Sequence, residues 1–368
     1  MQDEGEIIVS KKRIVKNQQY EQYWKLTLEY SDYYGKKFNK VLEIIVDYID
    51  KYVDPLVGIT SKLYKVLQKE VEKIYPKKDS ASTRKSINQM FKLGFIDNRG
   101  KSYHYLTKAF LKENNKNRKR ALYSRIVYEN ASFSRSYSEE TNDNEIQFLI
   151  KTIEECKIIT KEELLAIMFC KLCDYPKGYL TKTELASKLQ ELRISRTVER
   201  KYNQQSYLYN LCGNLTDIYT VNNTLSLNPG LLMDNQEKSY KGRDPYLQRI
   251  YKTELIDEEK QLYGDAIQKC VLEHKGYPIL IASHIKPYRV CEKAEQFDRD
   301  NGLLLSKNMD SLFDGGYITF DEKGNVIPSS KLDSEVAEYV KTFKLDPIIY
   351  NFRRQLYMCY HREHVFLG

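Results

Sequence analysis

A few polar side chains in the last third of the chain have the types and spacing needed for metal-assisted hydrolysis. His284 stands near the end of the apolar stretch ILIASHI, and Asp310 and Asp314 stand four residues apart in SKNMDSLFD. Side chains at that spacing share one face of a helix, where two carboxylates repel each other unless a cation lies between them. Their oxygens suit Mg²⁺ or Mn²⁺. A neutral imidazole near a metal-held phosphate can deprotonate the attacking water.

Other polar residues of this region are candidates for supporting roles. Asn301 can orient the imidazole or brace the loop through its side-chain amide. Lys286 and Arg289 can hold phosphate oxygens. Purely structural roles are the alternative, because a histidine often ends a strand, an aspartate pair often caps a helix or faces solvent, and an asparagine before a glycine often lies in a turn. The pattern of the whole region favours the catalytic interpretation.

The elements that would position these residues are two strands, a loop and a short helix. QKCVLE alternates as a strand does, HKGYP predicts a turn, and ILIASHI predicts a second strand that ends at His284. Ser306 or Asn308 can cap the helix of SKNMDSLFD, and Gly315 and Gly316 end it. YITF and NVIP follow as a hairpin. In this ββα order the end of the second strand would lie beside the first turn of the helix, so we expect His284 to approach the metal.

The stretches ASHIKPY and DRDNGLLLSKNMDSLFDGGYITF resemble the HNH, or ββα-metal, endonucleases, and most of all the restriction-type proteins among them. The resemblance covers about residues 265–366, where the closing YHREHVF also fits the way such proteins end. It implies a metal-dependent nuclease that hydrolyses phosphodiesters. By the family's pattern His284 is the general base and Asn301 is the middle, structural asparagine. Asp310 takes the place of the last histidine, with Asp314 one turn further on.

The chain departs from the family's pattern at its metal ligands. Ser283 stands where many HNH proteins have an acidic or histidine ligand, so Ser283 is expected to be at most a weak ligand. We expect the metal to rest on Asp310, Asp314, water and DNA phosphate. Aspartate in place of the last histidine implies one hard divalent cation per active site, Mg²⁺ or Mn²⁺. The paired CxxC motifs of many relatives are missing, so no structural zinc is expected, and the lone pair Cys170 and Cys173 is expected to be buried in a helix.

Residues 36–112 and 143–232 are each expected to form a winged-helix-like DNA-binding unit. In the first, two helical patterns precede the basic helix SASTRKSINQMFKLG and the hairpin turn DNRGKSY. The third helix of such a unit commonly enters the major groove. The segments INQMFKLGFI and SYLYNLCGNL occupy matching places and suggest a duplication, with two unrelated helical domains as the alternative. The expected groove contacts are Arg84, Lys85, Asn88 and Gln89 in the first unit and Gln204 and Gln205 in the second, with solvated helix faces as the simpler alternative.

The predicted fold class is α+β, with helical winged-helix-like units followed by a C-terminal ββα-metal (HNH) nuclease module. The expected organisation is an N-terminal cap (1–35), the first unit (36–112), a linker (113–142), the second unit (143–232), a linker (233–244) and the nuclease domain (245–368). The run KENNKNRKR at the start of the first linker is expected to be either a solvated flexible segment or a phosphate-binding one.

Composition agrees with a globular protein that binds nucleic acid. The 368 residues suggest two or three domains, with 41% hydrophobic and 30% charged residues and a net charge of +8. No apolar run is long enough to span a bilayer, and the acidic start MQDEGEIIV is unlike a secretory signal. The seven cysteines are scattered, which favours a reducing compartment, so a cytoplasmic protein without membrane contact is expected.

The resemblance implies a type II restriction enzyme that cuts double-stranded DNA at specific sites and leaves 5′-phosphate and 3′-hydroxyl ends. One active site cuts one strand, so a homodimer is expected at least on DNA, and a DNA methyltransferase is the expected partner of such a system. The alternatives are a modification-dependent nuclease that reads a methylated base, a winged-helix regulator whose nuclease module is inactive, and an RNA-directed or mobile-element nuclease.

Overall fold

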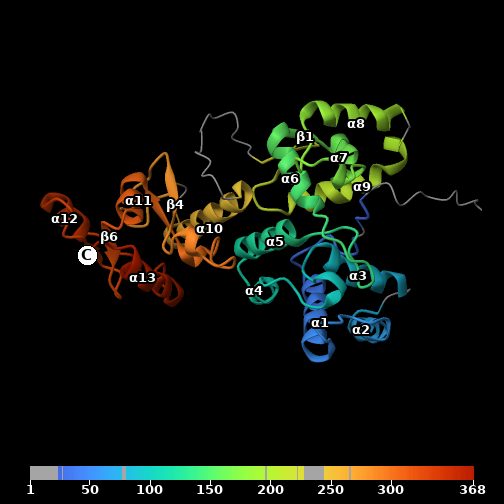
Figure 1. Ribbon diagram of the computed structural model, residues 1–368, viewed down its shortest axis with the longest axis horizontal. Coiled ribbons are helices and arrows are strands. Elements are labelled where there is room, and N and C mark those ends of the chain that lie inside the picture. Colours follow the sequence, from blue (N-terminus) through green and yellow to red (C-terminus); the bar gives the residue numbers. More distant parts are fainter. Residues whose placement is uncertain are drawn as a thin grey trace, which may run out of the picture.

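The computed structural model describes residues 24–26, 28–76, 80–194, 197–221, 223–227, 244–264 and 267–368, without the side chains of residues 80, 197–204 and 221. The N-terminal helices and the C-terminal elements lie at opposite ends of the long axis, and helix α10 (Pro245–Tyr263) lies between them (Figure 1). Most of the expected cap and most of the expected second linker fall outside the described residues. None of the described helices is long and apolar enough to cross a membrane.

Residues 36–112 form a small helical cluster with a short hairpin turn. Its helices are α1 (Lys36–Tyr52), α2 (Ser61–Ile74), α3 (Ser80–Lys92) and α4 (Thr107–Lys112). Phe38 and Leu42 of α1 and Ile87 and Phe91 of α3 are fully buried in its core. Between α3 and α4 an antiparallel bridge joins Ile96 to Tyr103. The expected order of helices and hairpin is therefore present, while the winged-helix assignment stays a prediction.

The expected linker 113–142 is wrong over much of its length, because Lys116–Asn130 forms helix α5. Residues 121–128 of this helix are all buried. The basic run at its start binds protein groups: Arg118 pairs with Glu113 at 3.2 Å, and Arg120 donates to the carbonyl of Leu215 at 2.7 Å. A helix buried around its circumference has no polar face, so the sequence shows no amphipathic stripe. The basic run at the start of α5 therefore connects the two N-terminal units directly.

Residues 145–226 form the second N-terminal unit, in which helices pack beside a small antiparallel sheet. Its elements are α6 (Glu145–Cys156), β1 (Ile158–Thr160), α7 (Lys161–Met168), α8 (Lys182–Ile194), α9 (Thr197–Gly213), β2 (Tyr219–Val221) and β3 (Thr224–Ser226). The strands pair in the order β1-β3-β2. Cys170 is buried but Cys173 is exposed, and both follow the end of α7. The expectation that both are buried helix cysteines is therefore wrong.

The C-terminal part contains the expected helix, the strand that ends at His284 and the closing hairpin, but the other strand of the ββα unit lies elsewhere than predicted. Its elements are β4 (Leu280–His284), β5 (Gly302–Ser306), α11 (Lys307–Asp314), β6 (Ile318–Phe320), β7 (Val326–Pro328), α12 (Ser334–Lys341) and α13 (Phe352–His364). The strand predicted over QKCVLE is wrong, because there only Lys269 makes a bridge, to Gly276. The second strand is β5, which pairs along its whole length with β4. His284 therefore ends the first strand of the ββα unit.

Helix α10 joins strands β4 and β5 to the N-terminal helices. Asp244 caps its start by accepting from the backbone of Tyr246 and Leu247, and Gly264, at φ +63°, ends it. It packs on α5 on one side and on β4 and β5 on the other. The carboxylate of Glu254 accepts from the Arg125 guanidinium of α5 at 2.5 Å, and both side chains are buried. Removing one partner of such a pair leaves a buried charge, so α5 and α10 are held in one arrangement.

Gln89 is buried, so its substitution is expected to affect stability more than substitution of the exposed residues of α3. Its Oε1 accepts from the backbone of Glu29 and Tyr30, and its Nε2 donates to the carbonyl of Tyr30. The expectation that Gln89 is exposed to DNA is wrong, because these bonds fix it in the core. We expect Gln89→Ala to lower the free energy of unfolding in urea by about 2 kcal/mol or more, since buried backbone groups lose their partners.

The control is Lys85→Ala on the same helix, where the side chain is exposed. That change should alter the free energy of unfolding by less than about 0.5 kcal/mol. Equal effects of the two substitutions would contradict the structural role of Gln89.

Candidate active site

His284 lies in a buried pocket of aromatic side chains at the end of β4. It pairs with Gly302 of β5 and is only 5% exposed. Its ring stacks on Tyr251 of α10 with 4.6 Å between centroids, and Tyr288 meets it edge-on at 5.7 Å. A side chain at position 302 would collide with the Tyr251 ring. Glycine at 302 is therefore what allows Tyr251 to reach the imidazole.

The hydrogen bond of the imidazole determines which nitrogen can act as a base. The Nε2 atom of His284 lies 2.7 Å from the backbone carbonyl oxygen of Gln296. A carbonyl oxygen can only accept, so Nε2 carries the proton. In the neutral ring Nδ1 then has the lone pair. The side chain is thus held in the tautomer that can take a proton at Nδ1.

Asn301 holds the loop that carries Gln296. It is fully buried at the end of the 3₁₀ turn Arg299–Asn301. Its Oδ1 accepts from the backbone N–H of Lys286 at 2.7 Å, while its Nδ2 lies within 3.2 Å of the carbonyls of Lys286 and Glu295. Of the two roles considered from the sequence, these contacts favour bracing the loop. Asn301 therefore acts on His284 through the backbone around it.

Lys286 and Arg289, the two basic residues expected to bind phosphate, differ in their contacts with the rest of the protein. The ammonium of Lys286 pairs with Glu295 at 2.5 Å and lies 5.4 Å from the ring centroid of Tyr360. The hydrogen bond to Glu295 raises the pKa of Lys286 above its usual value. Arg289, in contrast, is exposed. A phosphate at Lys286 would have to compete with Glu295, whereas Arg289 faces solvent.

The expected carboxylate ligands lie on α11, which packs on β4 and β5. Ser306 caps this helix by accepting from the N–H of Met309. Asp310 is half-buried in its first turn, and Asp314 is exposed at its last residue. Among the residues that the structure describes, no three His, Cys, Asp or Glu side chains lie together as a metal site would require. A cation here would depend on water and phosphate for most of its ligands.

Ser283 offers one further oxygen beside His284. Its hydroxyl is buried and has no hydrogen-bond partner within the described part of the chain. Successive side chains of a strand point to opposite faces, so Ser283 points away from the face that Tyr251 covers. A buried hydroxyl without a hydrogen-bond partner lowers the stability of the fold unless a ligand supplies that partner. An all-oxygen donor set of this kind fits Mg²⁺ or Mn²⁺ better than zinc.

The loop after His284 is also tied to the N-terminal part, which the sequence analysis did not foresee. Lys293 of this loop pairs with Glu129 at the end of α5, at 3.2 Å. His104 and Tyr105 also contact that carboxylate, each at 3.3 Å. Burial alone would raise the pKa of Glu129, but His104 and Lys293 hold it below its usual value. The loop after His284 is therefore joined by an ion pair to the N-terminal part of the chain.

The residues expected to contact DNA bases lie in the N-terminal part rather than beside His284. Arg84 and Lys85 are exposed on α3, and Asn88 is half-buried there. The side chain of Gln204 is outside the described residues, and Gln205 on α9 has a buried Oε1 atom without a hydrogen-bond partner in the described chain. Among the expected base contacts whose side chains the structure describes, Arg84 and Lys85 are exposed.

Sequence analysis missed Tyr251 and the carbonyl of Gln296. Tyr251 does have a local signal, since Leu247, Ile250 and Tyr251 follow the helical spacing of a buried face. That spacing predicts a helix but not the side chain that it would touch. The carbonyl of Gln296 has no side-chain signature at all.

The comparisons with known proteins agree with the position of this site. The family model described as HNH endonuclease matches residues 270–321, which include β4, the following loop, β5, α11 and the start of the closing hairpin. No curated protein matches the chain. The C-terminal part therefore contains an HNH nuclease module, which supports a DNA endonuclease activity. The N-terminal helices lie outside the matched residues.

A buried histidine next to α11 predicts how the stability of the protein depends on pH. His361 of α13 stacks on Phe313 at 4.0 Å, and its nitrogens lie 3.0 Å from Thr319 Oγ1 and 3.1 Å from the Phe313 carbonyl. Burial lowers its pKa from 6.5 to about 4. Between those values the unfolded chain binds more protons than the folded one, so stability falls as pH falls. The contribution is complete above pH 6.5 and amounts to about 3 kcal/mol at most.

We expect His361→Gln to flatten the pH dependence of the free energy of unfolding between pH 6.5 and 4. Urea titrations at several pH values measure this slope. His364 is exposed on the same helix, so His364→Gln should leave the slope unchanged. An unchanged slope in His361→Gln would show that His361 does not stay neutral in the fold.

Proposed function

We propose that the protein is a divalent-metal-dependent, site-specific endonuclease of the type II restriction kind, acting on double-stranded DNA. The observation that supports it most is the imidazole of His284, fixed through Nε2 by the Gln296 carbonyl and by stacking on Tyr251. This contact makes Nδ1 the nitrogen that can accept a proton when the ring is neutral. The match of the surrounding residues to the HNH endonuclease family adds the class of reaction.

The proposed chemistry assigns each of these residues a role. His284 Nδ1 removes a proton from water, and the hydroxide attacks phosphorus in line with the leaving 3′-oxygen. The bond from phosphorus to that oxygen breaks, and the leaving 3′-oxygen takes a proton from solvent water, which gives 5′-phosphate and 3′-hydroxyl ends. Asp310 and Asp314, with Ser283 as a further oxygen, would hold Mg²⁺ or Mn²⁺. When bound, the metal stabilises the negative charge of the transition state.

The N-terminal units are the proposed DNA readers. Arg84 and Lys85 on α3 are exposed and positively charged, as contacts to phosphates or base edges require. Because one HNH module cuts one strand, a homodimer on DNA is the proposed form for double-strand cleavage. A DNA methyltransferase that protects the host's own sites is the proposed partner of the enzyme.

A plasmid-cleavage assay tests the proposal. With Mg²⁺ or Mn²⁺ the protein should convert supercoiled plasmid to discrete linear fragments, and EDTA should abolish the reaction. His284→Ala should lower the single-turnover rate by about a hundredfold or more, since general-base catalysis contributes that much. Asp310→Ala should raise the metal concentration needed for half-maximal cleavage. Gel-shift titrations should show DNA binding unchanged in both variants.

His364→Ala is the matched control, because this exposed histidine lies in the same module and has no proposed role. Parallel reactions with methylated and unmethylated plasmid decide between restriction of unmodified DNA and cleavage that requires a modified base. Binding without cleavage on every substrate would instead favour a DNA-binding regulator with an inactive nuclease module.

A further inference from the structure

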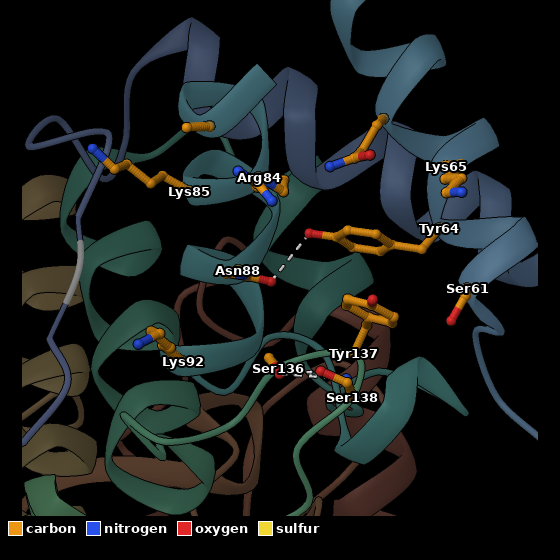
Figure 2. A pocket seen from close by; sticks show the side chains of 12 residues that line it. Ser61, Tyr64, Lys65, Arg84, Lys85, Asn88, Lys92, Ser136, Tyr137 and Ser138 are labelled. Atoms are coloured by element: carbon orange, nitrogen blue, oxygen red, sulfur yellow. Dashed lines mark hydrogen bonds between the residues drawn. The ribbon is translucent and has the colours of Figure 1, made fainter. Parts of the chain in front are cut away.

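A hollow of about 520 Å³ opens beside helix α3, in the N-terminal part of the molecule (Figures 1 and 2). Helices α2 and α3 form two of its sides, and residues 136–138, which follow α5, form a third. Its size is within the range of sites that bind small molecules. The hollow is lined by Ser61, Tyr64, Lys65, Gln68, Ala81, Arg84, Lys85, Asn88, Lys92, Ser136, Tyr137 and Ser138.

The charge of the lining favours an anionic ligand. Lys65, Arg84, Lys85 and Lys92 contribute to it, and none of the lining residues is an aspartate or a glutamate. Lys92 is held back from the opening, because its ammonium donates to the carbonyls of Lys25 and Phe133. The exposed Lys65, Arg84 and Lys85 remain to meet phosphate oxygens.

An aromatic pair at the same place favours a flat ligand. The rings of Tyr64 and Tyr137 stack with 3.8 Å between centroids and 12° between planes. The Tyr64 hydroxyl donates to Asn88 Oδ1 at 3.2 Å, which leaves the Nδ2 donors of the amide on the other side. Figure 2 shows Tyr64, Asn88 and Tyr137 converging from the helices and the loop. A fixed ring beside an amide is the combination that stacks on a nucleobase and binds its edge.

We propose that this hollow receives a single nucleotide of the DNA, with its base displaced from the duplex. The base stacks on Tyr137, the Asn88 amide donates to its edge, and Arg84 and Lys65 neutralise the adjoining phosphates. This inference rests on the proposed function in taking DNA as the ligand. A surface that only held the duplex backbone would need the cations but not the stacked rings.

The test compares two duplexes of the same arbitrary sequence, one fully paired and one with a single mismatch. A displaced base costs less to extrude from a mismatch, so a protein that holds it binds the mismatched duplex more tightly. Fluorescence anisotropy in EDTA measures both affinities without cleavage. We expect the wild type to prefer the mismatched duplex about tenfold, a preference that comes from the saved cost of unpairing.

The variants identify the site. Tyr137→Ala should lower affinity for the mismatched duplex by about tenfold, because base–ring stacking is lost. Without that stacking the base is no longer displaced, so both duplexes are bound through the same backbone contacts and their affinities become equal. Tyr137→Phe keeps the ring and should keep the preference, which also guards against an effect of misfolding. Lys65→Ala should weaken binding to both duplexes alike, more than Lys62→Ala, since Lys62 is an exposed lysine of the same helix that does not line the hollow.

Equal affinity of the wild type for the two duplexes, or a preference that survives Tyr137→Ala, would overturn the inference. Because no cleavage is measured, the outcome is independent of the nuclease activity. If the protein cuts plasmid but shows no mismatch preference, only the proposed role of the hollow is refuted. If it shows the Tyr137-dependent preference but never cuts DNA, only the proposed nuclease activity is refuted.

Discussion

The hydrogen bond from His284 Nε2 to the carbonyl of Gln296 is the constraint on which the account of this protein depends. It selects the tautomer of the imidazole and thereby the nitrogen that can accept a proton. The bond joins a side chain at the end of β4 to the backbone of a loop, so it requires the loop to keep its shape. Asn301 supplies that shape through its bonds to the backbone of the loop. The ion pair between Lys286 and Glu295 also joins two parts of this loop.

The same loop connects the nuclease module to the rest of the chain. Lys293 reaches Glu129 of α5, and α5 is itself joined to α10 by the buried pair of Arg125 and Glu254. Helix α10 then returns to the site, where Tyr251 covers the imidazole. A buried ion pair adds little net stability, but loss of one partner is costly, so such pairs fix the arrangement of the parts they join. The position of His284 therefore depends on elements from both parts of the chain.

The sequence allowed local features to be predicted more accurately than distant ones. Helix 307–314 and the hairpin after it follow from a serine cap and a pair of glycines, both of which act within a few residues. The strand partner of β4 was wrongly placed because pairing is not local, and the apolar run GLLLS could equally lead into the helix. The linker expected at 113–142 failed because a helix buried on all sides has no polar stripe.

At the site, the sequence singled out candidate residues by type and order, whereas Tyr251 and the Gln296 carbonyl, which contact His284, were missed. His284, Asn301 and the aspartates of α11 stand out by type and order, and the HNH endonuclease match covers them. Gln89 was misassigned because helical spacing does not decide which residues at the edge of an apolar face are covered. Tyr251 and the Gln296 carbonyl depend on contacts between elements far apart in sequence, which no local pattern encodes.

The most direct test of the central claim is the pH dependence of single-turnover DNA cleavage at saturating protein. If His284 Nδ1 is the base, the rate should rise tenfold per pH unit below the imidazole pKa and level off above it. His284→Ala should have a much lower rate without that inflection. An inflection that persists in His284→Ala, or cleavage at the wild-type rate, would contradict the assignment of His284 as the group that activates water.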